Sequence, residues 1–504
     1  MEAHSVYEEK LFDAGTSEFS KTLVFLSNQE ASAMGHSEVE EELATRLREI
    51  GRLLMEEHIQ LRGCGSVEDG IEGSDGVLRR QARPSNRNLI SIFGKIKVDR
   101  VTYSAKGESG ISPKDADLKL AAGSYSHALR KRAAMLVAEN SFESSQKTMK
   151  QAFGITIPKR QLEEIAEIAA KDFDAFYAES GREVLSCAGQ MPLQILTTDG
   201  KGVVMRREDL RDLTRQKAKE SSPKLKTRQS RGEKKNAKRM AQVASVYDID
   251  RLKRSSKDIV DENARLKLVK KRPKPSRKRV WASIEKDADT VIDDMFLEAI
   301  RRDTNREREW VVLVDGHRNQ MQLIEAAITK HNPKATIVVD IVHVIEYLWK
   351  AARVFYEETD PAGEKWVEEK LKSILDGRAP KAAAGMRRSA TLAGFDEAAR
   401  KPVDDCAKYL LRKKAYLNYA DYLSRGYPIG TGIIEGACRH LIKDRMDLTG
   451  ARWSLMGSEA VLKLRSLVKS RDFESYWDFH LAQEFKRNHQ DKYSNVEQVL
   501  KKLV

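Results

Sequence analysis

The sequence between residues 193 and 356 alternates short apolar runs with longer stretches of helical periodicity, and this alternation restricts the fold more than any other feature. Three strand-like runs come first in succession, at 193–205, 240–249 and 277–286. A helical stretch at 290–302 then begins a regular exchange of helices and strands. Consecutive strands pair as an antiparallel meander, whereas strands separated by helices pair in parallel. The pattern therefore predicts a mixed sheet within an α/β domain.

Three of these predicted strands each end on an aspartate. Asp199 follows "LQILTT", Asp315 follows "WVVLV" and Asp340 follows "ATIVV". A carboxylate in this position lies at the edge of the sheet on a rigid element. Two such acids that converge repel each other unless a cation bridges them, and oxygen-only ligands suit Mg²⁺ or Mn²⁺. The alternative interpretation is turn chemistry, because Asp-Gly after a strand is also a common turn.

The positive charge of the chain is concentrated in one block. The net charge is +14, yet residues 201–280 contain 28 Lys and Arg against 10 Asp and Glu, an excess of 18 positive charges. The rest of the chain therefore has a net charge of −4. A concentrated basic block predicts a polyanionic partner, most simply nucleic acid. The alternative is a solvated loop without a partner.

The residues before this region are predicted to be mostly helical. Residues 37–62 repeat leucine and isoleucine at intervals of three and four, as an amphipathic helix does. Residues 77–104 contain an alternating run after an "FGK" turn, which predicts a β-hairpin with basic outer positions. We expect residues 117–180 to be helical throughout.

Within that helical part, residues 141–170 have the pattern of a helix-turn-helix. A first helix from Phe142 is expected to end at Gly154, and Pro158 begins a second helix. The first turn of the second helix supplies the side chains expected to contact DNA: Lys159, Arg160 and Gln161. Two packed helices without a DNA partner have the same pattern, so this alternative stays open.

Length and composition limit the remaining possibilities. At 504 residues the chain is expected to form two or three domains. It contains no run of 18 apolar residues and no N-terminal apolar segment, which excludes a membrane-spanning helix and a secretory signal. Its four cysteines are scattered and form no Cys-x-x-Cys pair. This usage predicts a reduced, cytoplasmic protein.

Five blocks, in order along the chain, carry a resemblance to a known family. They are "TTDGKGV" (197–203), "WVVLVDGHRNQ" (310–320), "DIVHVIEYLWKAA" (340–352), "PIGTGIIEGACRHLIKDRM" (428–446) and "GARWS" with "GSEAVLKLR" (450–465). Together they resemble bacterial insertion-sequence transposases of the DDE type, most closely the ISKra-type group, which is related to the Mutator-like transposases. The resemblance implies an α/β ribonuclease H-like catalytic domain with an all-α insertion. A mostly helical N-terminal DNA-binding region is implied to precede it.

The resemblance also implies roles for particular residues. Asp199, Asp315 and Glu435 match the catalytic acids of the family, which hold Mg²⁺ or Mn²⁺. Asp340 and His343 match its Asp-x-x-His signature. We expect Asp340 and His343 to form a hydrogen-bonded pair beside the metal site. The alternative is that Asp340, in place of Asp315, is the second metal ligand. Further DNA contacts are expected from the following residues: Arg318, Arg439, His440, Lys443, Arg445 and Trp453. For Trp453, packing in the core is the alternative.

The implied organisation has six parts. They are an N-terminal helical and β-hairpin region (1–125), a helix-turn-helix region (126–190), the ribonuclease H-like core with a basic insertion at 205–280 (191–345), the all-α insertion (346–426), the glutamate helix (427–470) and a helical tail (471–504). The implied function is cleavage of DNA at the terminal inverted repeats of an insertion sequence and strand transfer into target DNA. A homo-oligomer in the bacterial cytoplasm, associated with the nucleoid, is expected to perform it. A DNA-binding regulator without catalysis and a stand-alone ribonuclease H-like nuclease are the alternatives.

Overall fold

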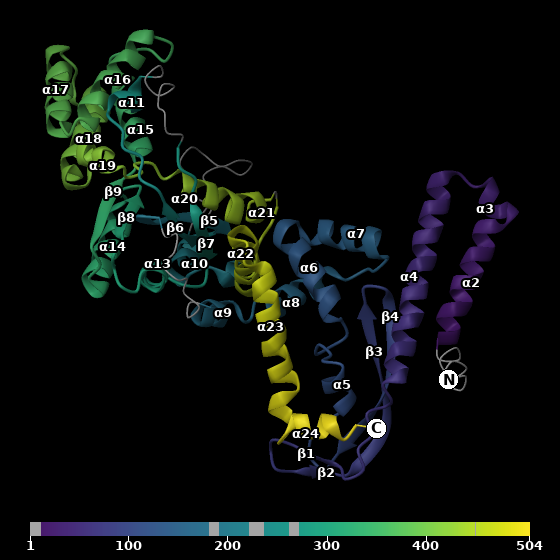
Figure 1. Cartoon of the computed structure of the whole chain (residues 1–504). Helices are drawn as coiled ribbons and strands as arrows, with labels where there is room; N and C mark the ends of the chain where they lie inside the picture. The colour runs from purple at the N-terminus through teal and green to yellow at the C-terminus, as the bar shows by residue number, and fades with distance from the viewer. Residues whose placement is uncertain (1–11, 181–190, 221–235, 262–271, 449, 504) are drawn as a thin grey trace. The chain divides into compact units, whose positions relative to one another are not determined.

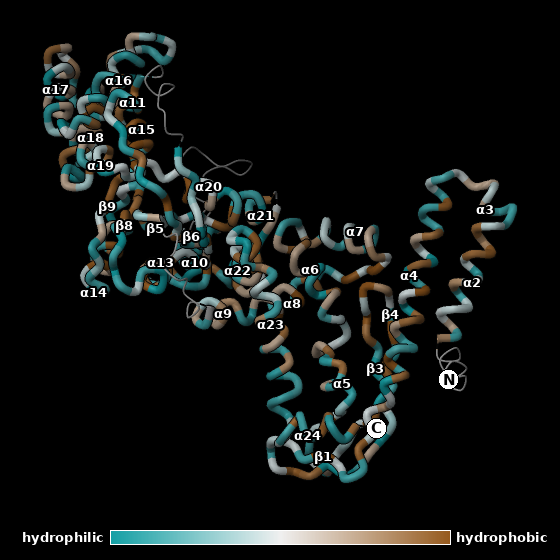
Figure 2. The backbone as a smooth tube through the Cα atoms, viewed as in Figure 1, coloured by the Kyte–Doolittle hydropathy of each residue, from teal (hydrophilic) through white to brown (hydrophobic). Residues whose placement is uncertain are grey.

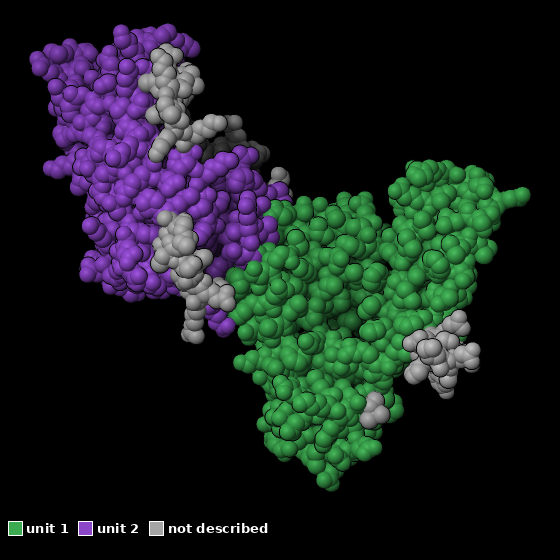
Figure 3. Space-filling view, in the orientation of Figure 1, with its two compact units in different colours: residues 1–176, 473–504 green, residues 177–472 purple. Residues whose placement is uncertain are grey.

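The computed structural model describes most of the chain, which divides into two compact units (Figure 3). The first unit joins residues 1–176 to residues 473–504, and the second comprises residues 177–472. The described residues are 12–180, 191–220, 236–261, 272–448 and 450–503. The basic block predicted at 201–280 therefore lies partly outside the described residues, and Cys187 lies wholly outside them.

A five-stranded mixed sheet forms the core of the second unit, in the order β7-β6-β5-β8-β9. Its strands are β5 (Leu193–Val204), β6 (Lys238–Ile249), β7 (Ser276–Ser283), β8 (Glu309–Val314) and β9 (Ala335–Val339). The first three pair antiparallel, whereas β8 and β9 pair in parallel with β5 and with each other. The predicted mixed α/β sheet is confirmed. Strand β6 runs through the basic block, so that block is not a single loop.

Residues 193–198 of β5 are all buried. Since adjacent side chains of a strand point to opposite faces, both faces of the sheet are covered. Helix α13 (Ala288–Arg302) packs against β5 and β6, and α22 (Leu455–Ser470) packs against β7. The parallel strands are connected by α14 (Arg318–His331), as the predicted alternation requires.

A group of helices follows the last strand and lies together in Figure 1. It contains α15 (Ile341–Ala352), α16 (Pro361–Leu375), α17 (Ala379–Leu392), α18 (Glu397–Arg412) and α19 (Tyr419–Arg425). Each begins with or near a residue suited to a helix start, such as Asp360 before Pro361. The helical character expected for this stretch is confirmed. The chain then returns to the sheet through the loop "YPIGT" at 427–431.

The first unit begins with a helical pair and a long hairpin. Helix α2 (Asp13–Ser27) and the short α3 (Gln29–Ala33) precede α4 (His36–Leu61), along which hydrophobic and hydrophilic colours alternate in Figure 2. Strands β3 (Gln81–Ser91) and β4 (Gly94–Ser104) pair antiparallel along their whole length. Both the helix expected at 37–62 and the hairpin are confirmed.

The two helices and the glycine turn predicted within 141–170 are also confirmed, whereas a DNA-binding role for them stays a prediction. Helix α7 (Phe142–Phe153) ends at Gly154, whose φ of 67° is left-handed and therefore favours glycine. Helix α8 (Lys159–Ala169) starts after Pro158, and both helices pack with α6 (His127–Glu139). The expectation of continuous helix from residue 117 is wrong, because residues 118–126 form turns and extended chain between α5 (Pro113–Asp117) and α6.

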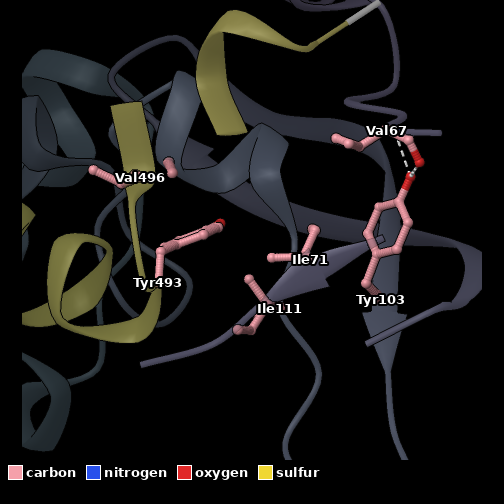
Figure 4. Packing of buried hydrophobic residues seen from close by; sticks show 7 residues of the cluster. Val67, Ile71, Tyr103, Ile111, Tyr493 and Val496 are labelled. Carbon is pink, nitrogen blue, oxygen red and sulfur yellow. Dashed lines mark hydrogen bonds between the residues drawn. The ribbon is translucent and has the colours of Figure 1, made fainter. Parts of the chain in front are cut away.

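The C-terminal residues complete the first unit and do not form a separate tail. Helix α24 (Val496–Lys501) and Tyr493 join a buried cluster with residues of the N-terminal part, among them Val67, Ile71 and Tyr103 (Figure 4). The Tyr103 hydroxyl also donates to the Val67 carbonyl oxygen at 2.8 Å. No helix among the described residues is long and apolar enough to cross a membrane.

Candidate active site

Three aspartates occupy neighbouring positions at one edge of the five-stranded sheet. Thr197 of β5 pairs with Leu313 of β8, and Asp199 and Asp315 each lie two residues further on. Val314 pairs with Val339 of β9, so Asp315 and Asp340 each lie one residue beyond that pair. Because paired strands are about 4.8 Å apart, the parallel register brings the backbones of these three residues together.

The strand that carries Asp199 does not end there, contrary to prediction. Strand β5 continues to Val204, and Asp199 pairs with Val243 of the antiparallel strand β6. The parallel ladder with β8 stops at Thr197 while the ladder with β6 continues, and this second partner keeps the chain extended. Asp199 therefore lies where two neighbouring strands separate, whereas Asp315 follows the end of β8 as predicted.

The side chains of Asp199 and Asp315 are each held by short-range contacts. Asp199 Oδ1 accepts from the backbone N–H of Gly200 at 2.6 Å, and its Oδ2 accepts from Cys438 Sγ at 3.3 Å. Asp315 Oδ1 accepts from the N–H of His317 at 2.7 Å. Both aspartates are half-buried, so each carboxylate is oriented but still open to solvent on one side.

Glu435 is an exposed carboxylate on the short helix α20 (Gly432–Ala437). Its side chain forms no hydrogen bond or ion pair within the part of the chain that the structure describes. The nearby basic residues are paired elsewhere: Arg439 and His440 both contact Asp444, at 3.6 and 3.1 Å. Glu435 is thus not neutralised by the basic residues that follow it.

Cys438 connects the helix of Glu435 to Asp199. It lies three residues after Glu435, about one helical turn, and its buried thiol donates to the Asp199 carboxylate. Burial, and then the negative charge of Asp199, raises the pKa of Cys438 well above its usual range, and Glu435 adds to this effect. The thiol therefore stays protonated and remains a hydrogen-bond donor. The sequence interpretation missed this residue, although its spacing from Glu435 was a usable signal.

The helix continues as a π-helix, η4 (Cys438–Lys443). Its exposed residues are the predicted DNA contacts Arg439, His440 and Lys443, while Cys438, Leu441 and Ile442 are buried. π-Helical turns occur often at functional sites, since they rotate side chains out of the regular helical pattern. The basic side chains are placed on the solvent side of the segment that carries Glu435.

Asp340 is engaged by the protein on both carboxylate oxygens. It is 0% exposed, caps α15 by accepting from the N–H of Val342 at 2.9 Å, and accepts from the hydroxyl of Thr431. The adjacent N–H of Ile341 donates to the carbonyl oxygen of Ile429 at 2.9 Å. Asp340 thus attaches the loop before Glu435 to the end of β9, a geometry that favours a structural role over metal binding.

The expected hydrogen-bonded pair of Asp340 and His343 is not formed. No hydrogen bond joins the two residues, both of which the structure describes, and His343 Nδ1 lies 3.5 Å from Glu346 Oε2. The reason is that Asp340 is the N-cap of α15 and its side chain turns back to its own helix and to Thr431.

Arg445 and Trp453 do not have the exposure that direct DNA contact requires. They are 2% and 6% exposed, and the Arg445 guanidinium lies 4.8 Å above the Trp453 ring. The Trp453 indole donates to the carbonyl oxygen of Met446 at 3.1 Å, and its backbone N–H donates to that of Val204. Burial, and then the charge of Arg465, lowers the pKa of Arg445 to about 10. The packing alternative is correct for Trp453, and Arg445 belongs to the same buried contact.

The predicted helix-turn-helix contacts lie in the other unit. Lys159 and Arg160 are exposed and form surface ion pairs with Glu143 and Glu164 at 3.3 and 3.2 Å. Such pairs are weak, so both cations can exchange their partner for a phosphate. Gln161 accepts from the hydroxyl of Tyr125, which holds its side chain against the protein. Arg318 is exposed in the first turn of α14, three residues after Asp315.

The donor set suits a hard divalent cation in kind, but the side chains are not gathered around one point. Within the described ranges, no three His, Cys, Asp or Glu side chains are grouped so that they could hold a metal ion. The hydroxyl of Thr197, on the same sheet face as Asp199, is buried without a hydrogen-bond partner among the described residues. The carboxylate oxygens of Asp199 and Asp315 are nevertheless the type of ligand that Mg²⁺ and Mn²⁺ prefer.

Comparison with known protein families finds no match for this chain, and comparison with curated proteins finds none either. Among solved structures, the Drosophila P element transposase strand transfer complex is similar to this chain, with 10% sequence identity and a TM-score of 0.24. The similarity covers 75% of this chain and 84% of that chain. A likeness of this size assigns neither fold nor function, and membership of the insertion-sequence group stays a prediction.

Proposed function

We propose that this protein is a DDE-type transposase that cuts DNA at the ends of an insertion sequence and joins the ends to target DNA. The observation that carries the proposal is that Asp199 and Asp315 follow paired positions of neighbouring strands, and that the segment carrying Glu435 contacts Asp199. The parallel register brings the two aspartates together, and the Cys438–Asp199 hydrogen bond connects the third acid to them. A regulator without catalysis has no use for two oriented aspartates and an exposed glutamate connected to them.

The sheet supports a ribonuclease H-like core as part of this proposal. An antiparallel meander is followed by two parallel strands, and the first strand is central. In this order the first strand lies directly beside the fourth, and both present their acids at the same edge. The helices of 341–425 would be the all-α insertion that separates the second acid from Glu435.

Asp199, Asp315 and Glu435 would hold Mg²⁺ or Mn²⁺. The bound cation would supply activation of the attacking oxygen and charge neutralisation at the phosphate. The protein's own residues have separate tasks. Cys438 orients Asp199, and Asp340 fixes the loop that precedes Glu435.

DNA would be bound by exposed cations around this edge and by the helix-turn-helix. Arg318 follows Asp315 by one helical turn, and Arg439, His440 and Lys443 follow Glu435 on the solvent side of the same helix. Their contacts would be to phosphates, because flexible exposed cations position a duplex without reading its sequence. Lys159 and Arg160, in the first turn of α8, are the candidates for contacts to base edges.

The test is a cleavage and strand-transfer assay with the inverted repeats that flank the gene. The unaltered chain is expected to cut and join these ends in Mg²⁺, whereas Asp199→Asn, Asp315→Asn and Glu435→Gln lower both reactions by at least about a thousandfold. Glu358→Gln is the matched control, because Glu358 is an exposed acid that forms a surface ion pair with Arg353. Each variant must retain DNA binding in a mobility-shift assay.

The two alternative functions give different results in the same assay. A stand-alone nuclease cuts the ends but never joins them to a target. A regulator binds them without cutting. Metal-dependent cleavage that survives in Asp199→Asn or Glu435→Gln would show that the assignment of these acids is wrong.

A further inference from the structure

A cavity of about 420 Å³ lies beside the loop that leads into the helix of Glu435. It is formed by the end of β6, the segment 272–275 and residues 426–433 of the second unit. Its volume is within the usual range for sites that bind small organic ligands. None of the residues predicted to contact DNA or metal lines it, so it is distinct from the three acids.

The lining of this cavity carries an excess of positive charge. Arg254, Arg272 and Lys274 line it, and Asp250 is the only acid in its lining within the described residues. Burial, and then the charge of Arg272, lowers the pKa of Arg254, so the two guanidinium groups repel each other there. The arrangement is therefore suited to an anion that would relieve this repulsion.

The guanidinium of Arg254 also has one buried N–H donor without a hydrogen-bond partner among the described residues. Its Nη2 donates to the carbonyl oxygen of Tyr427 at 2.9 Å, which fixes the guanidinium. Its Nε is buried and has no hydrogen-bond partner among the residues that the structure describes. A buried donor without a partner costs stability, so the protein alone does not satisfy this guanidinium fully.

The rest of the lining contains apolar side chains and a glycine whose backbone is accessible. Tyr247, Ile249, Leu252 and Ile429 are all buried and line the cavity. A side chain added at Gly432 would meet nothing within 4 Å, so a ligand can approach the backbone at this point. A lining that contains both cations and apolar side chains suits a ligand that has a phosphate and a ring system.

We propose that this cavity binds one nucleotide of a DNA strand. Its phosphate contacts Arg254 and Arg272, and its base lies against Ile249 and Ile433. Gly432 lines the cavity and Glu435 lies one helical turn beyond it, on the same side of α20, so the bound nucleotide is held next to the acid. The inference rests on the proposed function only in taking DNA as the ligand.

The test uses the full chain with Glu435→Gln, so that binding is measured without catalysis. The probe is a fluorescein-labelled single-stranded oligonucleotide of mixed sequence, followed by fluorescence anisotropy. Arg272→Glu is expected to weaken binding by about tenfold or more, the effect of one lost charge-assisted contact. Lys253→Glu, an exposed neighbour outside the lining, is the matched control and should change binding less than about twofold.

A second variant and a crosslink locate the bound nucleotide. Ile433→Trp fills the cavity and is expected to displace the strand, with folding checked by circular dichroism. Photocrosslinking with a 4-thiothymidine oligonucleotide should label peptides 247–254 or 426–433, and the label should disappear in Arg272→Glu. Crosslinks elsewhere, or equal binding in Arg272→Glu and Lys253→Glu, overturn the inference.

A competition experiment distinguishes a nucleotide of a DNA strand from a free nucleotide as the ligand of the cavity. If a free nucleoside monophosphate or triphosphate occupies the cavity and the oligonucleotide does not, the site is for a free nucleotide and the inference is wrong. The failure of the proposed function has a different signature, because a protein without cleavage or joining activity can still give the cavity crosslink. A protein that cuts and joins DNA but gives no cavity crosslink refutes this inference alone.

Discussion

The contact between Asp340 and Thr431 gives a sharp prediction about how the loop before Glu435 is held. Thr431→Val keeps the shape of the side chain but removes the hydroxyl that donates to Asp340. The Asp340 carboxylate is 0% exposed, so no water can replace the lost donor without rearrangement. A hydrogen bond to a charged group contributes about 1.5–3 kcal/mol, and we expect a loss of this size.

The size of the effect on Asp340 itself follows from its two contacts. Asp340→Ala removes the N-cap of α15, worth about 1 kcal/mol, together with the Thr431 bond, so the total is about 2.5–4 kcal/mol. Asp340→Asn retains an oxygen that can cap the helix and should cost less. In a double-mutant cycle, Asp340→Ala and Thr431→Val should be coupled by about 1.5–3 kcal/mol.

Hydrogen exchange measured by mass spectrometry is the suitable assay, because the effect is local and the chain has two units. Peptides covering 341–345 and 429–435 should exchange about 10- to 150-fold faster in Thr431→Val. Thr431→Ser keeps the hydroxyl and is the matched control. Unchanged exchange in Thr431→Val would refute the role of this contact.

The same variants decide the role of Asp340 in metal binding. If Asp340 is structural, Asp340→Asn binds Mn²⁺ as the unaltered chain does in electron paramagnetic resonance titrations, whereas Asp315→Asn binds it much more weakly. Equal loss of Mn²⁺ in both variants would assign Asp340 as a metal ligand and contradict the structural interpretation.

Three further predictions concern buried side chains. Cys438→Ala should lower the rate of strand cleavage about tenfold because Asp199 loses its donor, while Cys438→Ser, which keeps a donor, should restore most of it. Burial opposes ionisation of Asp172, but hydrogen bonds from His480 and Arg487 prevail and lower its pKa to about 2. The ionised Asp172 therefore stabilises the folded chain by about 2 kcal/mol above pH 4, and this stabilisation is lost as the pH falls to 2. The urea midpoint should fall over the same pH range in the unaltered chain, and this fall should be absent in Asp172→Asn. Trp453→Ala should destabilise the second unit by about 3–5 kcal/mol in urea denaturation, and reduced DNA binding at unchanged stability would contradict this.

Local patterns were sufficient to predict most elements of the structure. The apolar runs, the Gly154 cap and the hairpin turn depend on interactions between residues close in sequence, and each element formed as its pattern indicates. The parallel and antiparallel order of the sheet also followed from the sequence, since connection length decides which strands can pair. Asp315 and Asp340 follow the ends of their strands as the sequence predicts, whereas Asp199 lies inside β5.

The roles of individual side chains depended on contacts between distant parts of the chain. Whether Asp340 faces a cation or Thr431, and whether Trp453 faces DNA or Arg445, is decided by residues far away in sequence. Strand β5 continues past Asp199 only because β6 remains paired to it, and no local signal at Asp199 contains this information. The sequence alone determined the elements and their order, because those arise from local geometry and burial periodicity. Only the tertiary structure decided which polar groups are exposed and which are already satisfied, because that depends on what packs against them.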